Sequence, residues 1–275
     1  MNTLEQLTKK WVSHLEVKNY ASSSIASHRN RIATFVTWCH ERSLDKVGHI
    51  TKPVIDRYQR WLFNYRNAKD QPLTFHSQRA SLHTIRAFFK WLARSNHILY
   101  NPASELELPK VPKRIPRNVL TPDEVKRIIN QIDVKTPLGL RDRAMIETFY
   151  SCGIRRTELI NLSIYDIDFE AGTVFIREGK NKKDRLIPLG DTAIKWVRKY
   201  LADVRPLLAQ QPDNLNLFIT KKGSPFLGTN ISNLVRTYCD AAEITKKGSC
   251  HMFRHSMATL MLENGADIRF IQAIL

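Results

Sequence analysis

The sequence predicts a mainly α-helical protein in two parts, a helical N-terminal bundle and a mixed α/β domain with a small antiparallel sheet. Three observations support this. Four successive segments before residue 107 repeat apolar residues at three-and-four spacing. A basic, proline-rich segment follows at 108–120. Beyond it, helical patterns surround two short β-like runs that flank a lysine-rich turn. With 275 residues, 43% of them hydrophobic, the chain can bury two ordinary cores.

The first domain is predicted to span residues 1–107 as a bundle of four helices joined by short polar loops. Each helix has an apolar stripe that can face a shared core. The third begins near Thr51, where a capping residue and an early proline favour a helix start. The stripes contain Leu4, Leu7, Trp11 and Leu15; Ile25, Ile32, Phe35, Val36 and Cys39; Val54, Tyr58, Trp61, Leu62 and Tyr65; and Leu82, Ile85, Phe88, Phe89 and Leu92.

Basic residues form a row on the polar face of the fourth helix. The row contains Arg79, Arg86, Lys90 and Arg94. A positive stripe opposite an apolar one is what a helix needs to follow a phosphate backbone. Arg79, Arg86 and Lys90 are therefore candidate DNA contacts, and an ordinary solvated face is the alternative.

Residues 108–120 form the predicted linker. Its three prolines prevent a helix and keep the segment extended. Its basic residues include Lys113 and Arg114, which are candidate DNA contacts because a stiff basic connector could wrap around a duplex. A plain spacer is the alternative. A capping box with proline at the first helical position begins at Thr121, so the second domain is predicted at 121–275.

Two helices are expected at 121–132 and 139–151, and a tight helix junction follows them. Gly153 can end one helix, and the next begins at once. Arg155 then lies at a well-fixed position from which it could point into a cleft, and Glu158 could brace it. The alternative is a surface arginine near a helix start, where the helix dipole would not favour it.

The two β-like runs, 173–177 and 185–189, read as a hairpin with a lysine-rich tip. Such a tip could enter a DNA groove, and one lysine could reach a phosphate. Lys182 and Arg185 are candidate DNA contacts, and Lys180 is a candidate catalytic residue. A solubilising turn is the alternative.

Three further elements are expected next, a helix at 191–208, a short strand at 217–219 and a helix near 229–242. A last pair of helices is predicted around Gly265, which with the two residues after it breaks one helix and restarts another. The first of this pair starts at Cys250, where Ser249 can serve as its cap.

His251 and Arg254 are three residues apart and share one face of the helix that starts at Cys250. A fixed cation beside a group that can carry a proton suits a phosphate undergoing substitution. By itself the pair could equally be a solvated helix face. A metal site at His251 and His255 is not expected, because no third ligand accompanies them.

Composition narrows the class of partner. The net charge of +17 favours a polyanion, and nucleic acid is the first candidate. A merely soluble basic protein, or one that touches anionic lipid, is the alternative. No apolar run is long enough to span a bilayer, and the N-terminus lacks the apolar core of a signal peptide. The four scattered cysteines read as reduced thiols, so we expect a cytoplasmic protein.

The order of these motifs resembles the tyrosine recombinases, the phage integrase family, over nearly the whole chain. It is most similar to the compact Xer-type and simple phage or transposon recombinases of bacteria. The resemblance rests on the segments Gly153–Leu159, Gly179–Gly190 and His251–Thr259, followed by Gly265–Ile268 and Ile271–Gln272.

This resemblance implies a mechanism. Arg155 and Arg254 would clamp the scissile phosphate, Lys180 would protonate the departing 5′ oxygen, and His251 would handle the nucleophile's proton or hydrogen-bond the phosphate. A tyrosine would attack phosphorus and leave a 3′-phosphotyrosyl bond. That bond retains the free energy of the phosphodiester, so neither a cofactor such as ATP nor a metal is implied. Four protomers would assemble on two double-stranded recombination sites and exchange strands through a Holliday junction.

One departure from the family concerns the nucleophile. In the family a Gly-His element and then the tyrosine follow the last motif, but the last tyrosine here is Tyr238, which we interpret as a core or DNA-facing residue. Tyr150, Tyr165 and Tyr200 lie in apolar patterns and are poor candidates. We therefore expect a C-terminally truncated chain. Site-specific DNA recombination or integration is the leading hypothesis. The alternatives are a cleavage-deficient site-specific DNA-binding protein and an enzyme like type IB topoisomerases.

Overall fold

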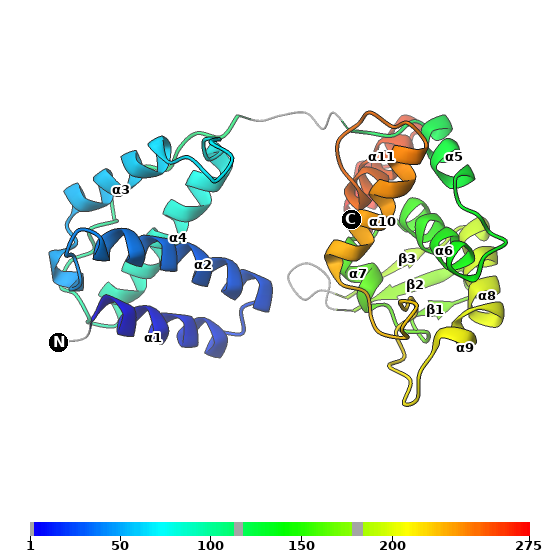
Figure 1. The fold of residues 1–275 in the computed structure, drawn as a ribbon, viewed down its shortest axis with the longest axis horizontal. Helices are drawn as coiled ribbons and strands as arrows, with labels where there is room; N and C mark the ends of the chain where they lie inside the picture. The colour runs from blue at the N-terminus through cyan, green and yellow to red at the C-terminus, as the bar shows by residue number, and fades with distance from the viewer. Residues whose placement is uncertain (1–2, 113–117, 178–183) are drawn as a thin grey trace. The chain divides into compact units, whose positions relative to one another are not determined.

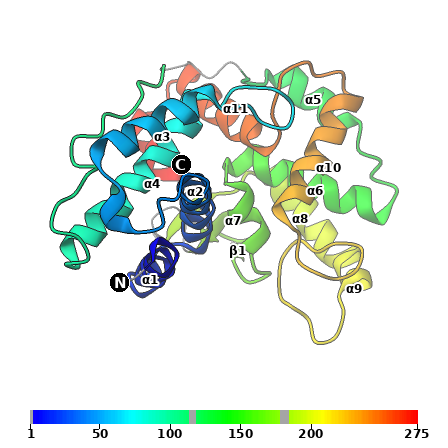
Figure 2. The same ribbon diagram turned by 60° about the vertical axis from the view of Figure 1, so that its left-hand side comes forward.

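The computed structural model describes residues 3–112, 118–177 and 184–275. The chain divides into two compact units, Met1–Arg114 and Ile115–Leu275, and each has its own hydrophobic core (Figures 1 and 2). Four of the predicted site residues lie outside the described residues: Lys113, Arg114, Lys180 and Lys182.

The first unit consists of the four predicted helices and a short 3₁₀ turn, η1. Their bounds are α1 (Leu4–Val17), α2 (Ser22–His40), η1 (Val47–His49), α3 (Lys52–Asn64) and α4 (Phe75–Arg94). Contacts of α4 with each of the other three helices close the bundle. The predicted stripes form the core, in which Trp11, Phe35 and Phe88 are almost completely buried. Tyr65 is the exception: it is exposed, because α3 ends at Asn64.

The second unit combines eight helices with one sheet among the described residues. The helices are α5 (Pro122–Asn130), α6 (Pro137–Cys152), α7 (Arg156–Asn161), α8 (Asp191–Asp203), α9 (Arg205–Leu208), α10 (Gly228–Ala241), α11 (Cys250–Glu263) and α12 (Ile268–Ile274). The strands are β1 (Ile167–Asp168), β2 (Thr173–Ile176) and β3 (Arg185–Pro188). They form an antiparallel sheet in the order β1-β2-β3, which confirms the predicted small sheet.

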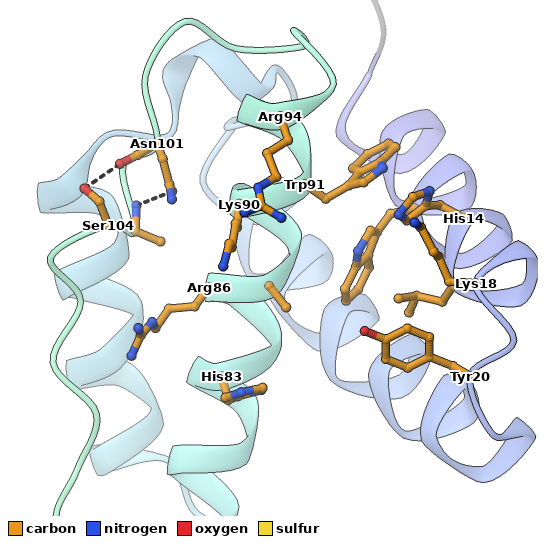
Figure 3. Close-up of a pocket in the computed structure, with 14 residues that line it drawn as sticks. His14, Lys18, Tyr20, His83, Arg86, Lys90, Trp91, Arg94, Asn101 and Ser104 are labelled. Atoms are coloured by element: carbon orange, nitrogen blue, oxygen red, sulfur yellow. Dashed lines mark hydrogen bonds between the residues drawn. The ribbon is translucent and has the colours of Figure 1, made fainter. Parts of the chain in front are cut away.

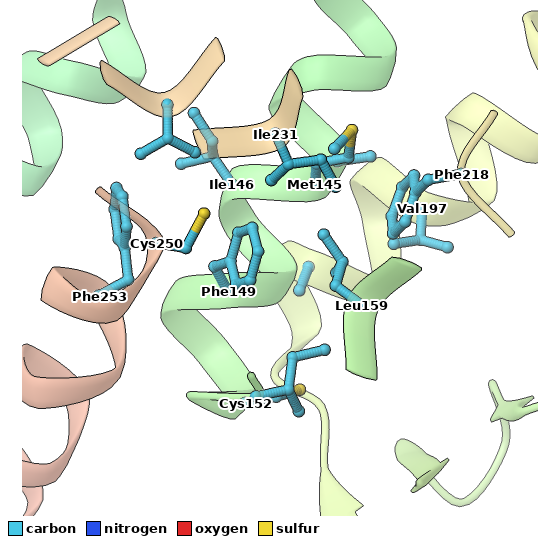
Figure 4. Close-up of a cluster of buried hydrophobic side chains, with 14 of the residues drawn as sticks. Met145, Ile146, Phe149, Cys152, Leu159, Val197, Phe218, Ile231, Cys250 and Phe253 are labelled. Atoms are coloured by element: carbon cyan, nitrogen blue, oxygen red, sulfur yellow. The ribbon is translucent and has the colours of Figure 1, made fainter. Parts of the chain in front are cut away.

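The core of the second unit is organised around α6. In Figure 4, Phe149 of α6 lies between Phe253 and Cys250 of α11 on one side and Leu159 of α7 on the other. Helix α6 also packs on α8 and on β3. Because α6 is buried on most of its surface, it fixes the starts of α7 and α11, the two elements that carry Arg155 and Arg254.

Two predicted elements differ in the structure. The helix expected at 191–208 breaks at Val204 into α8 and α9, because Pro206 cannot lie inside a continuous helix. The strand expected at 217–219 is absent from the described sheet. Leu217 donates its backbone N–H to the Leu162 carbonyl, and Ile219 donates its own to the Tyr200 hydroxyl. The segment is buried, yet its backbone bonds go to scattered partners instead of one neighbouring strand.

One predicted cap also differs. Ser249 precedes α11, but its side chain makes no capping hydrogen bond; its backbone carbonyl accepts from the Met252 N–H instead. The predicted capping box at Thr121 is present, as is the break at Gly265. Among the described residues no helix has the length and apolarity to cross a bilayer.

Candidate functional site

The junction between α6 and α7 fixes Arg155. Gly153 ends α6 in the left-handed conformation, with φ of 56°, and Arg155 is the N-cap of α7. Glu158, one turn into α7, accepts from the Arg155 backbone N–H at 2.8 Å and from its Nη1 at 2.7 Å. The sequence predicted both the junction and this brace.

Arg155 and Arg254 converge on one oxygen atom, although 98 other residues separate them in the sequence. Arg254 Nη1 donates to the Gly153 carbonyl at 2.6 Å. Arg155 Nη2 donates to the Leu275 carbonyl at 2.6 Å, and Arg254 Nη2 donates to the same carbonyl. Two guanidinium groups thus present N–H donors to a single acceptor, which is a geometry suited to an anionic oxygen.

The electrostatics of this pocket favour an anion. Three arginines, Arg155, Arg185 and Arg254, surround Glu158. Burial alone would raise the pKa of Glu158, but hydrogen bonds from Arg185 and Arg155 lower that pKa to about 2. Burial and the charge of Arg155 lower the pKa of Arg254 to about 10. Three cations around one carboxylate leave an excess of positive charge.

His251 lies on α11 one turn before Arg254. Partial burial and the nearby charges of His255, Arg156 and the two pocket arginines lower its pKa below the ordinary value of 6.5. Its imidazole is therefore neutral near pH 7 and can accept a proton. Within the described residues, no cluster of three potential metal ligands is present.

The geometry does not support Arg185 as a DNA contact. Its side chain is only 15% exposed. Its Nη1 and Nη2 donate to the two carboxylate oxygens of Glu158 at 3.0 Å and 2.7 Å, and its Nε donates to the Ile274 carbonyl at 2.8 Å. Most of its donors are therefore already used inside the second unit.

A basic groove of about 800 Å³ lies in the first unit between α1 and α4. Arg86, Lys90 and Arg94 line it from α4, and Lys18 lies on the opposite side, at the end of α1 (Figure 3). Arg79 is exposed on the same helix, about two turns before Arg86, and does not line the groove. None of the ion pairs between described residues uses these five side chains. Their charge is available to a partner.

Sequence reasoning missed two residues near the pocket. Arg156 contributes to the low pKa of His251 and donates to the Ser232 hydroxyl at 2.7 Å, and its only signal was adjacency to Arg155. Ser256 is buried in α11, where its hydroxyl accepts from the Leu120 N–H at 2.6 Å. This bond fastens the last residue of the predicted linker to the helix of His251 and Arg254, and nothing in the sequence marks it.

Three tyrosines of the second unit are placed clearly. Tyr238 donates its hydroxyl to the buried carboxylate of Asp142 at 2.8 Å, so it belongs to a core network. Tyr200 is buried against Phe218. Tyr165, which the sequence placed in an apolar pattern, is 73% exposed because it lies in the turn before β1. None of the hydrogen bonds between described residues connects a tyrosine to Arg155 or Arg254.

Comparisons with known families match both units. The profile described as "Phage integrase family" matches residues 118–275, and "Phage integrase, N-terminal SAM-like domain" matches residues 7–97. Tyrosine recombinase XerC 2 of Ralstonia nicotianae is 45% identical over 98% of this chain and 78% of its own length. Tyrosine recombinase XerC of Oceanobacillus iheyensis is 31% identical over 100% of this chain and 88% of its own.

Solved structures share the fold. XerH site-specific recombinase bound to difH substrate has a TM-score of 0.76 at 19% identity, covering 100% of this chain and 78% of that one. A lambda integrase tetramer bound to a Holliday junction has a TM-score of 0.73 at 17% identity, covering 100% and 74%. XerA recombinase is 28% identical with a TM-score of 0.53, covering 98% and 89%.

Proposed function

Because this chain belongs to the phage integrase family of tyrosine recombinases, we propose that it breaks and rejoins DNA strands at specific recombination sites. The observation that carries this proposal is the convergence of Arg155 and Arg254 on the Leu275 carbonyl oxygen. A non-bridging phosphate oxygen accepts hydrogen bonds in the same way and adds negative charge, which the three-arginine pocket would stabilise.

The proposed roles follow the geometry. Arg155 and Arg254 bind the non-bridging oxygens of the scissile phosphate and stabilise the charge that grows there in the transition state. A tyrosine oxygen forms a bond to phosphorus while the bond to the 5′ oxygen breaks. His251, neutral near pH 7, takes the tyrosine proton or hydrogen-bonds the phosphate. Lys180, outside the described residues, gives a proton to the 5′ oxygen.

The nucleophile is the part of this mechanism that the described residues do not supply. Tyr238 and Tyr200 are held in the core, and no tyrosine follows Tyr238 in the sequence. We propose that neither of these two is the attacking tyrosine. The phosphotyrosyl bond would conserve the energy of the broken phosphodiester, so the reaction would need neither ATP nor a metal.

The proposed partners are double-stranded recombination sites and further copies of this chain. The groove with Arg86 and Lys90 would follow the DNA backbone, and Arg79, Lys113, Arg114 and Lys182 are proposed as further phosphate contacts. A lambda integrase tetramer bound to a Holliday junction supports a tetramer on DNA. A protein that recombines bacterial DNA acts in the cytoplasm, and we propose that location.

The test is a covalent trap combined with a gel-shift assay. The DNA carries sequence that flanks the gene of this protein, with a nick near the candidate cleavage site. Site-specific retention in the gel-shift assay supports the recombinase proposal, and retention no stronger than that of unrelated DNA contradicts it. An adduct on a denaturing gel would place the nucleophile within residues 1–275, and mapping the modified residue would identify it.

A second candidate is a site-specific DNA-binding protein that does not cleave. Among the described residues, no tyrosine is hydrogen-bonded to Arg155 or Arg254, and this observation favours it. Specific retention without an adduct, even from a version of the protein that includes the nucleophilic tyrosine, is its expected result. Relaxation of a supercoiled plasmid that lacks the site would instead indicate topoisomerase activity.

A further inference from the structure

We propose that Arg185 is a positioning residue that holds Glu158 and, through Glu158, fixes the guanidinium of Arg155 without contacting DNA itself. The inference rests on the proposed phosphate-binding role of Arg155. It adds to the pocket a residue from β3, an element that carries neither Arg155 nor Arg254.

Four hydrogen bonds converge on the Glu158 carboxylate. Two come from Arg155, through its backbone N–H at 2.8 Å and its Nη1 at 2.7 Å. The other two come from Arg185, which spans both oxygens at 3.0 Å and 2.7 Å. A two-point arginine–carboxylate contact has a defined geometry. Since the Glu158 side chain is only 5% exposed, water competes little for this contact.

The bonds from Arg155 cannot position the pair by themselves. Arg155 and Glu158 both lie at the start of α7, so bonds between them fix each residue only relative to its own helix. Arg185 lies on β3, which pairs with β2 along its whole length. Its contact with Glu158 therefore ties the start of α7 to the sheet.

The same guanidinium also reaches α12. Arg185 Nε donates to the Ile274 carbonyl at 2.8 Å, and the next carbonyl, that of Leu275, accepts from Arg155 and Arg254. One side chain thus joins α7, β3 and α12 around the oxygen on which the two arginines converge. Without the Arg185 guanidinium, Glu158 would lose its link to β3 and the Ile274 carbonyl would lose its donor.

Charge gives a second reason for this role. Although burial opposes ionisation of Glu158, hydrogen bonds from Arg185 and Arg155 lower its pKa to about 2. The carboxylate is therefore ionised and keeps all its acceptors at neutral pH. Its two oxygens can then hold Arg155 in place against repulsion from Arg254.

Arg185→Lys is the informative variant. Lysine keeps the charge, but its compact ammonium cannot span both oxygens of Glu158 while also donating to Ile274. A residue that served as a cation for DNA would tolerate the change, whereas a positioning residue would not. Arg198→Lys is the matched control, because Arg198 is an exposed arginine on α8.

The first measurement needs no DNA. NMR of arginine-labelled protein follows solvent exchange of the Arg155 guanidinium protons. Arg185→Lys is expected to accelerate that exchange about tenfold or more, because Arg155 loses its fixed partner, while Arg198→Lys leaves it unchanged. Unchanged exchange in Arg185→Lys would overturn the proposal. If Arg185→Lys does not fold, Glu158→Gln is measured instead. It is expected to accelerate the Arg155 exchange equally, and unchanged exchange in it would overturn the proposal.

The second measurement is a double-mutant cycle on the affinity for a fluorescein-labelled duplex of mixed sequence. Arg155→Ala and Arg185→Lys are each expected to weaken binding, and the double variant is expected to match Arg155→Ala within about twofold. If the fold-losses in affinity of the two single variants instead multiply in the double variant, Arg185 is a separate DNA contact and the proposal is overturned. If the unmodified chain does not bind the duplex, the proposed function fails, and proton exchange alone decides the role of Arg185.

Discussion

Arg155 and Arg254 owe their orientation to protein acceptors that hold them before any ligand arrives. Arg254 is bonded to the Gly153 carbonyl, and Arg155 is bonded to Glu158. Donors fixed in this way stabilise a developing charge without reorganising. In the trap with nicked DNA, run with a version of the protein that includes the nucleophilic tyrosine, Arg155→Ala or Arg254→Ala is expected to lower adduct yield about a hundredfold or more. Duplex affinity should change far less, and a comparable loss of both would contradict the assigned roles.

Glu158 gives the second prediction at the residue scale. Its pKa in the folded protein is about 2, below the ordinary value of 4.5. A lowered pKa contributes stability above pH 4.5, and this contribution disappears as the pH falls from 4.5 toward 2. This contribution to the free energy of unfolding amounts to roughly 3 kcal/mol, since one pKa unit corresponds to about 1.4 kcal/mol.

Urea unfolding across that pH range measures this contribution. Glu158→Gln is expected to be less stable than the unmodified protein at pH 7, with the difference shrinking as the pH falls. Glu170→Gln, at an exposed position after β1, serves as the control. A difference that stays constant with pH would contradict the prediction.

Among the elements, the start of α7 depends on the conformation that ends α6. Gly153 has φ of 56°, and a Cβ there would lie 2.1 Å from Met257 Cε. Gly153→Ala is therefore expected to destabilise the protein by about 1–3 kcal/mol and to displace the carbonyl that accepts from Arg254. Thermal unfolding measures the first effect. Gly48→Ala, where a Cβ meets no atom within 4 Å, is the matched control and should change little.

On the scale of the whole molecule, the two cores share no residue. Each buries its own aromatic and aliphatic side chains, so each unit has the content of an independently folding domain. A fragment that ends at residue 112 is expected to fold alone and to unfold cooperatively. Circular dichroism during heating tests this, and a fragment without a cooperative transition would show that the first unit needs the second.

The charge of the molecule gives the last prediction. A net charge of +17 implies DNA affinity that falls steeply with salt. Replacing Arg86 and Lys90 with alanine together is expected to lower the slope of log affinity against log salt by about two, one for each lost phosphate contact. The pair Lys195→Ala and Lys199→Ala, exposed on α8, is the matched control for lost charge. An equal effect of both pairs would mean that the groove has no special role.

The sequence by itself determined the helical bundle, the small sheet and the approximate place of nearly every helix. Apolar periodicity, capping residues and prolines act over a few residues, so their effects on helices and strands can be recognised from the sequence without tertiary structure. It also singled out Arg155, His251 and Arg254 as candidate site residues, because the motifs that carry them are local. The break in the helix at Val204 was missed even though Pro206 marks it.

Only the tertiary structure decided which groups meet. Arg155 and Arg254 share the Leu275 carbonyl, and Arg185, a DNA-contact candidate from the sequence, is hydrogen-bonded to Glu158. The buried segment at 217–219 likewise found scattered backbone partners instead of a strand. These contacts join residues from 19 to 120 positions apart. Local pattern fixes which face of an element is polar, whereas packing of distant elements around α6 fixes what that face touches.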